Sequence, residues 1–598
     1  MNFKLKKNPN KSVISLNSNN AQLLGIEKIT YTLVRFGFIV ADVEIKIDDT
    51  LANEIVSVSE NVFEKLYLPK GNRYLINIVD KEIVFGPLMG IFLGMENLNY
   101  NWKYERLESF ITNYEEINGV VCAFSEKDLD LSRMTVNAYY YDAYFKIWRK
   151  QILPLPSTLN IFGNISKRLK RLLRGIYGNN LYNYNEMDKW AESKVLQRHP
   201  LASVYLPETI ISSDVEIFKG FVDKHEDVYF KPIKGRQGKG IHRICKQEDD
   251  SYTLTIQAVE AKEYKNINFE NIDVLIKELN DKIVSSQFIL QKTINLIINN
   301  RVIDFRLRFD KNIENEWKLS LAASRVSDLG GVVSNRSAGG KVVSVEQSLE
   351  EYYGYSESEA KNKKNELIKA GKILTEAVEE NNVNYGKCAV DLGVDNDGNI
   401  WHIESNIKAP NDTTTLSFEK YEGLDRVCQL GISYNKRLAG FKNINNTIEL
   451  LPSEKKSALT AAESSYDLFV TGQFMDEKFV NYIKEETTNY VNNNFSLRKK
   501  RSYVLLTLEN ISEKELIDLV YRIRKQDNKN VVRTVLYNKV NKKVKKVKQS
   551  KNVELEKKNE EIEKELKKLN KEIKKMKNSN SWKMTAPIRI IGRVLKRK

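Results

Sequence analysis

The chain has 598 residues, 41% of them hydrophobic, and six Trp, so it is long enough for several domains that each bury their own core. Its four cysteines lie far apart without CxxC spacing, which argues against a disulfide framework and indicates a reduced, intracellular setting. No run of about 18 apolar residues occurs, so the sequence predicts neither a secretion signal nor a membrane-spanning helix.

The charge is concentrated at one end of the chain. Residues 539–598 hold 22 Lys and Arg against 7 Asp and Glu, a net charge of +15, whereas the whole chain carries +16. The remainder is therefore almost neutral, and the basic element is the C-terminal segment.

Residues 1–180 read as short strands that alternate with turns, and they become aromatic around 139–148. They contain no group of side chains that indicates chemistry. We expect a β-rich N-terminal domain here.

The first element that indicates chemistry is a strand followed by a glycine-rich loop. Val228–Pro232 is largely apolar and carries Lys231 near its end. The loop after it contains Lys234, Gly235, Gly238, Lys239 and Gly240. Backbone N–H groups of such a loop can close over phosphate oxygens while the cations neutralise their charge. The loop matches neither GxxxxGK[ST] nor GxGxxG, and alone it could be a solvated basic turn.

A second pattern occurs further along the chain. An apolar strand leads to Asp391, Asp395–Gly398 reads as a tight turn, and the next strand ends in Glu404 and Asn406. Because the strands of a hairpin lie side by side, two carboxylates and an amide oxygen would meet, as a hard cation such as Mg²⁺ requires. In isolation, the two carboxylates could equally be solvated groups at strand ends.

Residues 455–540 form a further unit in the sequence. Strand patterns at 466–472, 502–508 and 530–537 alternate with helical patterns at 479–490 and 513–524. Ser512, with Glu515 three residues on, is a capping box that would start the second helix. We expect a small α/β domain without a catalytic constellation, with a role in protein contact or glycan positioning.

The basic tail has three parts. Lys542–Lys548 is polybasic, and residues 555–576 then place apolar side chains at alternating spacings of three and four, with Asn559 at an a-type position. This seam is either a short two-stranded coiled coil or a single solvated helix. From Ile588 onward apolar residues share one helical face and cations the other, and together with Trp582 this suits an anionic membrane surface. A generic basic helix is the alternative.

Together, these motifs resemble those of an ATP-grasp protein. The matching pieces, in the family's order, are Asp188–Lys189, Phe230–Pro232 with its loop, Phe288–Lys292, Asp304–Arg306, Ala323–Arg325, and Asp391 with Glu404 and Asn406. Within the superfamily the chain resembles the YheC/YheD type, associated with endospore coats. This resemblance covers residues 20–430 and rests on Phe85–Gly90, Leu153–Pro156 and Asn335–Gly340.

The resemblance implies nucleotide-binding roles. Lys189 and Lys231 would contact the phosphates of ATP together with the glycine-rich loop, and Lys194 competes with Lys189 because one helix presents both. The backbone around Gln291 and Thr293 would bind adenine.

The resemblance also implies a catalytic pair and a metal site. Arg306 and Arg325 would be the catalytic residues that steady the γ-phosphate and an acyl-phosphate, since a rigid guanidinium fork suits a spread anionic charge. Asp391, Glu404 and Asn406 would hold Mg²⁺, or Mn²⁺ in its place. The family usually has Pro three residues after the metal-binding Asn, whereas here Pro lies four residues after it, which leaves the acceptor pocket less defined.

The implied activity is ATP-dependent ligation. A carboxylate attacks the γ-phosphate to give an acyl-phosphate and ADP, and an amine or hydroxyl then displaces phosphate. Ser581–Arg589 resembles a terminal sequence that follows coiled coils in bacterial glycosyltransferases of surface-polysaccharide assembly, which suggests a cell-envelope or spore-coat glycan or peptide as acceptor. The alternative is a non-catalytic, ATP-binding scaffold of the coat or envelope. Nucleic-acid binding by the tail is a weaker hypothesis, because the tail has one Trp and no stacking series.

We therefore predict a mixed α/β (α+β) protein with an ATP-grasp fold. The expected units are an N-terminal YheC/YheD-like domain at 1–180, an ATP-grasp domain at 181–445, a small α/β domain at 455–540, a polybasic segment with a short coiled coil at 541–580, and a basic amphipathic membrane-surface helix at 581–598. The protein would be cytoplasmic, peripheral to the inner face of the membrane or to the spore coat, and a homodimer if the coiled coil forms.

Overall fold

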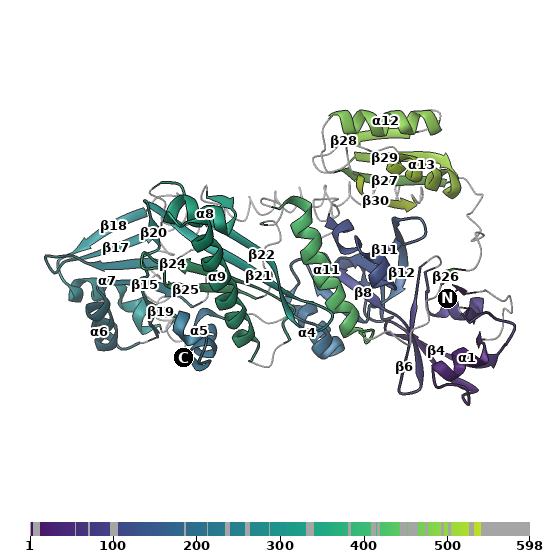
Figure 1. The fold of residues 1–598 in the computed structure, drawn as a ribbon, viewed down its shortest axis with the longest axis horizontal. Helices are drawn as coiled ribbons and strands as arrows, with labels where there is room; N and C mark the ends of the chain where they lie inside the picture. Colours follow the sequence, from purple (N-terminus) through teal and green to yellow (C-terminus); the bar gives the residue numbers. More distant parts are fainter. Residues whose placement is uncertain are drawn as a thin grey trace, which may run out of the picture.

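The computed structural model describes residues 2–3, 12–53, 55–69, 72–95, 106–183, 187–211, 213–233, 240–257, 264–285, 287–329, 340–380, 384–407, 414, 419–442, 451–452, 464–472, 477–491, 495–499, 504–525 and 532–539. The expected coiled coil and terminal basic helix lie outside these residues. Four large sheets organise the described part, and they follow one another along an elongated body (Figure 1).

The N-terminal region begins with a six-stranded sheet in the order β5-β2-β4-β3-β7-β6. Its elements are β2 (Val13–Leu16), α1 (Ser18–Leu23), β3 (Tyr31–Phe36), β4 (Ile39–Ile47), β5 (Ser57–Val58), α2 (Glu60–Lys65), β6 (Leu75–Val79) and β7 (Glu82–Gly86). Alternate residues of β4 are buried, as expected for a strand with one face on a core.

The second N-terminal sheet continues directly into the C-terminal part of the chain. It contains β8 (Leu88–Phe92), β9 (Val120–Phe124), β10 (Leu129–Asp130), β11 (Thr135–Asp142), β12 (Ile147–Pro154) and β13 (Thr158–Ile161). The short helix α3 (Tyr114–Ile117) precedes β9, and the basic helix α4 (Lys167–Tyr177) follows β13. β12 pairs in parallel with β30, which joins the sheet to the strands that follow residue 464.

Residues 464–539 have a βαββαβ order. The elements are β27 (Ser464–Gly472), α12 (Glu477–Val491), β28 (Phe495–Lys499), β29 (Val504–Ile511), α13 (Glu513–Lys525) and β30 (Val532–Lys539), with strand order β30-β27-β29-β28. This is the split βαβ topology of ferredoxin-like folds. The three expected strands and two expected helices are present, and β28 is a strand that the sequence analysis missed.

The capping box predicted at the start of α13 is confirmed. The Glu515 carboxylate accepts hydrogen bonds from the backbone N–H and the hydroxyl of Ser512, at 2.8 and 2.7 Å. The Ser512 hydroxyl in turn accepts from the Glu515 N–H at 3.2 Å. These bonds satisfy donors that the first turn of a helix leaves without partners.

The central region has one sheet of six antiparallel strands in the order β14-β19-β15-β16-β17-β18. The strands are β14 (Thr209–Ile210), β15 (Asp227–Pro232), β16 (His242–Lys246), β17 (Tyr252–Gln257), β18 (Tyr264–Phe269) and β19 (Phe288–Lys292). Helices α6 (Val215–His225) and α7 (Ile272–Val284) pack on one face and form a core with it.

The second central sheet has the order β23-β22-β21-β24-β25, and β20 pairs with β21. The strands are β20 (Ile297–Ile298), β21 (Arg301–Lys311), β22 (Trp317–Val326), β23 (Lys341–Val343), β24 (Lys387–Val394) and β25 (Ile400–Asn406). Helices α5 (Lys189–Arg198), α8 (Val345–Tyr353) and α9 (Glu357–Glu379) share its apolar core, and α11 (Lys420–Leu438) runs toward the N-terminal region (Figure 1).

Helix α9 shows how the sequence produces this packing. Ser356 and Glu359 form a capping box at its start. Its buried residues recur at helical spacing and face the sheet. Gly371 allows the closest approach, because a Cβ at this position would lie 2.9 Å from a methyl carbon of Leu307 and 3.0 Å from the Phe309 ring.

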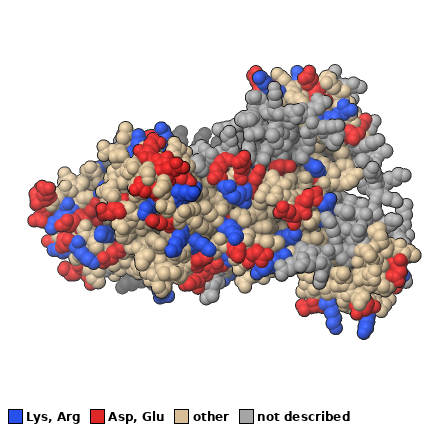
Figure 2. Space-filling view, viewed as in Figure 1, with Lys and Arg blue, Asp and Glu red and all other residues tan. Residues whose placement is uncertain are grey.

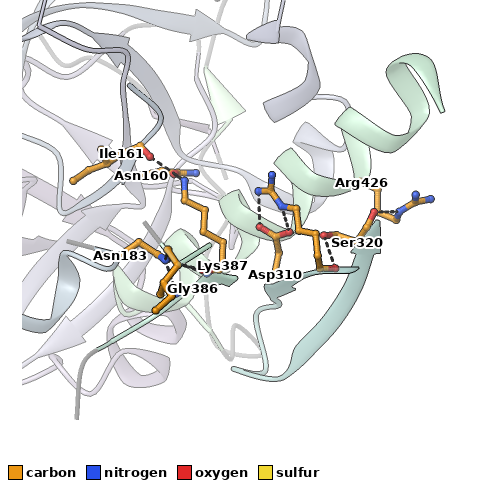
Figure 3. A network of polar contacts seen from close by, with 10 residues as sticks. Asn160, Ile161, Asn183, Asp310, Ser320, Gly386, Lys387 and Arg426 are labelled. Carbon is orange, nitrogen blue, oxygen red and sulfur yellow. Dashed lines mark hydrogen bonds and ion pairs between the residues drawn. The ribbon is translucent and has the colours of Figure 1, made fainter. Parts of the chain in front are cut away.

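A buried polar joint connects the second central sheet to the N-terminal region (Figure 3). The Lys387 ammonium at the start of β24 donates to the Asn160 side-chain oxygen at 3.2 Å and to the Ile161 carbonyl at 2.9 Å, both on β13. Burial, and secondly the nearby Arg308 guanidinium, lower the pKa of Lys387 to about 8. Asn183 completes the joint, since its amide group bonds the backbone of residues 386 and 387.

The surface carries both signs of charge. Figure 2 shows Lys and Arg interspersed with Asp and Glu over the described part of the visible face. This mixture agrees with the nearly neutral charge of the chain before residue 539. Among the described helices, none combines the length and apolar composition needed to cross a membrane.

The packing of β21 against α9 predicts a large cost for Leu307→Ala. Leu307 is fully buried, so the substitution should lower the free energy of unfolding by about 2–5 kcal/mol. Val284→Ala is the control, because Val284 is 57% exposed at the end of α7 and its loss should change stability by no more than about 0.5 kcal/mol. Urea titration followed by circular dichroism measures both, and equal effects would contradict the observed packing.

Candidate functional site

The hairpin predicted around Asp395–Gly398 is present. Gly398 has a φ of +82°, and its N–H donates to the Asp395 carbonyl at 3.0 Å. The Asp395 carboxylate accepts from the N–H groups of Asp397 and Asn399 and from the Trp401 indole. The turn therefore rests on glycine's tolerance of positive φ and on an aspartate that bonds the backbone ahead of it.

The strands of this hairpin bring together the three residues expected to bind metal. Asp391 on β24 lies directly opposite Glu404 on β25, and Ala389 lies opposite Asn406. The Asn406 amide nitrogen lies 3.4 Å from a carboxylate oxygen of Asp391 and 3.4 Å from one of Glu404. The cross-strand register thus places two carboxylates and an amide beside one another.

Asp391 is the buried centre of this group. The Arg306 guanidinium donates two hydrogen bonds to its carboxylate, at 2.8 and 2.6 Å, and Arg325 donates a third at 2.9 Å. Arg325 also donates to Asp304 at 2.5 Å. Burial alone would raise the pKa of Asp391, but the two guanidinium groups outweigh it and hold this pKa at about 2. Asp391 is therefore ionised at any ordinary pH.

Glu404 has a different environment. Its side chain keeps an exposed surface, yet the surrounding protein, and secondly the Asp391 charge, raise its pKa. No described cation forms an ion pair with it. Glu404 is thus the carboxylate in this group that lacks a counter-charge.

Two lysines face the carboxylates. Asp188 caps α5 by accepting from the Ala191 N–H at 2.9 Å, and Lys189 is the first residue of that helix. The Lys189 N–H donates to the Ile233 carbonyl at 3.3 Å, which joins the start of α5 to the end of β15. The pKa of Lys189 is lowered by burial, although Glu404 acts in the opposite direction.

Lys231 projects from β15 beside Lys189. Burial, and secondly the Lys189 charge, lower the pKa of Lys231 to about 7. Its ammonium donates to the Gln291 side-chain oxygen at 2.6 Å, and the Gln291 amide donates to the Thr209 hydroxyl at 3.0 Å. Among the described residues, no carboxylate forms an ion pair with Lys231 or with Lys189. Neither lysine therefore has a paired anion.

Lys194, the competitor for the first lysine position, lies elsewhere. It is exposed, and its ammonium lies 5.6 Å from the centre of the Trp190 ring. The structure thus brings Lys189 to Lys231 and Glu404 and leaves Lys194 on the outer side of the helix.

The expected adenine-binding strand is β19. The Thr293 N–H donates to the Asp227 carbonyl at 3.0 Å, so it is used within the protein. The Thr293 hydroxyl oxygen is buried and has no hydrogen-bond partner. An unsatisfied buried hydroxyl at this point is compatible with a polar ligand group beside it.

Most of the glycine-rich loop lies outside the described residues, including Lys234, Gly235, Gly238 and Lys239. Gly240, at its end, is described and has a φ of +74°, which favours glycine. The phosphate role of this loop stays a prediction.

The sequence analysis missed Glu192. It lies on α5, three residues after Lys189, and its buried carboxylate is 3.2 Å from the His402 ring nitrogen. Acidic residues are common in the first turn of a helix, so its sequence position did not distinguish it. His402, on β25, is buried as well.

The residues present fit a magnesium nucleotide. Among the described residues, Lys189 and Lys231 have no anionic ion-pair partner, and Glu404 has no cationic one. Polyphosphate and Mg²⁺ would supply both charges together. Among the described residues no group of three or more His, Cys, Asp or Glu could hold a metal, so a metal here would depend on the Asn406 oxygen and on phosphate oxygens as well.

Comparisons with known proteins identify the central region. Residues 178–438 match the family described as YheC/D like ATP-grasp. Endospore coat-associated protein YheD of Bacillus subtilis (strain 168) is 24% identical over 376 residues, which are 59% of this chain and 79% of that protein. Endospore coat-associated protein YheC of the same organism is 26% identical over 228 residues, 37% of this chain and 59% of that protein.

Two solved structures show a weaker likeness. D-cycloserine synthetase DcsG is 12% identical with a TM-score of 0.34, covering 58% of this chain and 99% of that one. ATP-grasp ligase PsnB, complexed with minimal precursor, Mg and ADP, is 12% identical with a TM-score of 0.32, covering 58% and 98%.

The geometry predicts that Asp391→Asn is strongly destabilising. It leaves the Arg306 guanidinium buried without its counterion, so unfolding should become easier by about 3–5 kcal/mol. Because the pKa of Asp391 is depressed in the folded state, its charge stabilises the fold above the unfolded pKa and loses this effect as the pH falls toward about 2. The loss in free energy of unfolding caused by Asp391→Asn should thus be constant from neutral pH down to the pKa of an aspartate in the unfolded chain. Below that pKa the loss should become smaller.

Asp273→Asn is the matched control for this experiment. Asp273 forms an exposed ion pair with Lys219 at 3.0 Å, and such pairs contribute about 0–1 kcal/mol. Thermal unfolding over a series of pH values measures both variants. A loss at Asp391 no greater than that at Asp273 would show that the buried contacts do not hold the site together.

Proposed function

Because residues 178–438 belong to the YheC/D-like ATP-grasp family, we propose that the site between β15 and the β24–β25 hairpin binds Mg·ATP and uses it to join a carboxylate to an amine or hydroxyl. The observation that carries this proposal is the charge pattern. Lys189 and Lys231, which form no ion pair with a described carboxylate, lie near Glu404, which forms no ion pair with a described cation.

Each residue has a role in the proposal. Lys189 and Lys231 would bind the phosphates, and the backbone and hydroxyl around Thr293 would face the base. Glu404 and Asn406, with Asp391 behind them, would hold Mg²⁺. When bound, Mg²⁺ neutralises charge on the phosphates and favours displacement at the γ-phosphorus.

The reaction needs no covalent enzyme intermediate. A substrate carboxylate oxygen attacks the γ-phosphorus, the bond to the β-phosphate oxygen breaks, and ADP leaves. The amine or hydroxyl then attacks the acyl carbon and inorganic phosphate leaves, while the nucleophile loses its proton to solvent or to a nearby base. Arg306 and Arg325 would act by fixing Asp391 and by placing positive charge close to the acyl-phosphate.

The acceptor is proposed from the relatives and from the tail. YheD and YheC are endospore coat-associated proteins, so a coat or envelope glycan or peptide is the acceptor that we favour. The basic tail that would hold the protein at an anionic membrane surface lies outside the described residues. Its role and that of the 464–539 region stay part of this proposal.

A non-catalytic, ATP-binding scaffold is the second candidate. One observation favours it: both guanidinium groups proposed for catalysis are engaged by Asp391 and Asp304. In this case nucleotide would stabilise the protein without being consumed.

The test is ADP release from Mg·ATP with pooled amino acids and uronic-acid oligosaccharides. Stimulated release should fall by about 100-fold or more in Glu404→Ala, because the metal loses its charged ligand. Glu376→Ala should be unaffected, since Glu376 is exposed on the outer face of α9. Mg·ATP binding without stimulated release from any pool would support the scaffold.

Lys231 allows a separate test that does not require turnover. With a pKa of about 7, its amine is about nine-tenths neutral at pH 8. Bound phosphates favour the ammonium form and raise this pKa, so Mg·ADP binding at pH 8 should take up a proton. Calorimetry in buffers of different ionisation enthalpy measures the uptake, and Lys231→Gln should abolish it. Equal uptake by the variant would remove Lys231 from the phosphate site.

A further inference from the structure

A buried contact behind the proposed site joins α5 to β25. The His402 ring nitrogen Nε2 forms a hydrogen bond with the Ser405 hydroxyl at 2.9 Å and lies 3.2 Å from the Glu192 carboxylate oxygen Oε1, which has no hydrogen-bond partner among the described residues. The side chains of Glu192 and His402 are 9% and 8% exposed. Neither residue has a place in the roles assigned above.

A β-bulge explains why His402 can reach α5. The register pairs Asp391 with Glu404 but Leu392 with His402, so Ile403 is an extra residue on β25. Without it, residues 402 and 404 would face the same side of the sheet. With it, Glu404 faces the site beside Asp391, while His402 faces the side of Leu392, which belongs to the apolar core that α5 shares.

The partner of His402 lies on the first turn of α5. Glu192 follows Lys189 by three residues, and side chains three apart are neighbours on a helix surface. β25 is the edge strand of its sheet, and the charge of Glu404 on this strand acts on Lys189 at the start of α5. One contact thus connects the turn that carries Lys189 to the strand segment that carries Glu404.

We propose that Glu192 and His402 are a positioning pair that sets the place of Lys189 relative to Glu404 and thereby the affinity for the magnesium nucleotide. This inference rests on the proposed function. Lys189 would contact phosphate and Glu404 would contact the metal, so both must be correctly spaced for one ligand to satisfy them. The pair touches neither phosphate nor metal itself.

A purely structural role makes a different prediction. A buried carboxylate beside a histidine can simply balance charge in the core, and loss of the histidine would then lower stability only. A positioning role requires that nucleotide affinity changes while the fold is retained. The dissociation constant and the melting temperature must therefore be measured on the same variants.

The experiment uses the full chain and Mg·ADP as the probe in isothermal titration calorimetry. His402→Leu, which removes the contact, should raise the dissociation constant about 10-fold, equivalent to about 1.4 kcal/mol. His402→Gln, which keeps a polar side chain of similar reach beside Glu192, should stay within a few-fold of the unaltered protein. Glu192→Gln, which keeps a hydrogen-bonding side chain without its charge, should lie between them.

His199→Gln is the matched control. His199 lies at the other end of α5 and its ring is 3.5 Å from the Glu380 carboxylate, so it also links α5 to the rest of the domain. It is far along the helix from Lys189, and its substitution should leave Mg·ADP affinity unchanged.

A double-mutant cycle tests whether the effect passes through Lys189. In a Lys189→Met background, His402→Leu should weaken binding less than two-fold further, because the residue to be positioned is already absent. Additive effects would overturn the proposal, and so would a lower melting temperature in His402→Leu with an unchanged dissociation constant. If the unaltered protein does not bind Mg·ADP, the proposed function is overturned as well. If the unaltered protein and His402→Leu bind Mg·ADP equally well, this inference alone is overturned.

Discussion

The Asp391 carboxylate is the interaction on which the site depends. It is buried, and an unpaired buried charge would strongly destabilise the fold, but the guanidinium groups of Arg306 on the adjacent strand β21 and of Arg325 on β22 compensate for it. These bonds tie β21, β22 and β24 together on the face that carries the site. β25 pairs with β24 so that Glu404 lies directly opposite Asp391. The position of Glu404 therefore depends on the position of Asp391.

The remaining charges are arranged around that ionised centre. Burial, and secondly the Asp391 charge, raise the pKa of Glu404, and burial lowers the pKa of Lys189 and of Lys231. The protein thus keeps positive and negative groups apart across one site without pairing them. Without a ligand, these unpaired charges lower the free energy of unfolding. A ligand that carries both signs of charge would pair with them and stabilise the folded protein. A magnesium nucleotide has this property.

Several parts of the fold and the site could be predicted from the sequence because they rest on local rules. Gly398 and Asp395 indicated the hairpin turn that places β24 and β25 side by side. Ser512 with Glu515 indicated the start of α13. The missed strand β28 is a counterexample, since Phe495–Lys499 alternates apolar and polar residues but is short and has two exposed cations.

The sequence alone determined the hairpin, the order of the motifs and the near neutrality of the chain before its basic tail, because turns, alternation and charge are properties of neighbouring residues. Only the tertiary structure decided that Lys189 and not Lys194 meets Lys231, that both arginines bind Asp391, and that Glu192 contacts His402. These contacts join residues far apart in the chain, and a single β-bulge reverses the side to which a residue points. Such effects depend on packing, which local patterns do not encode.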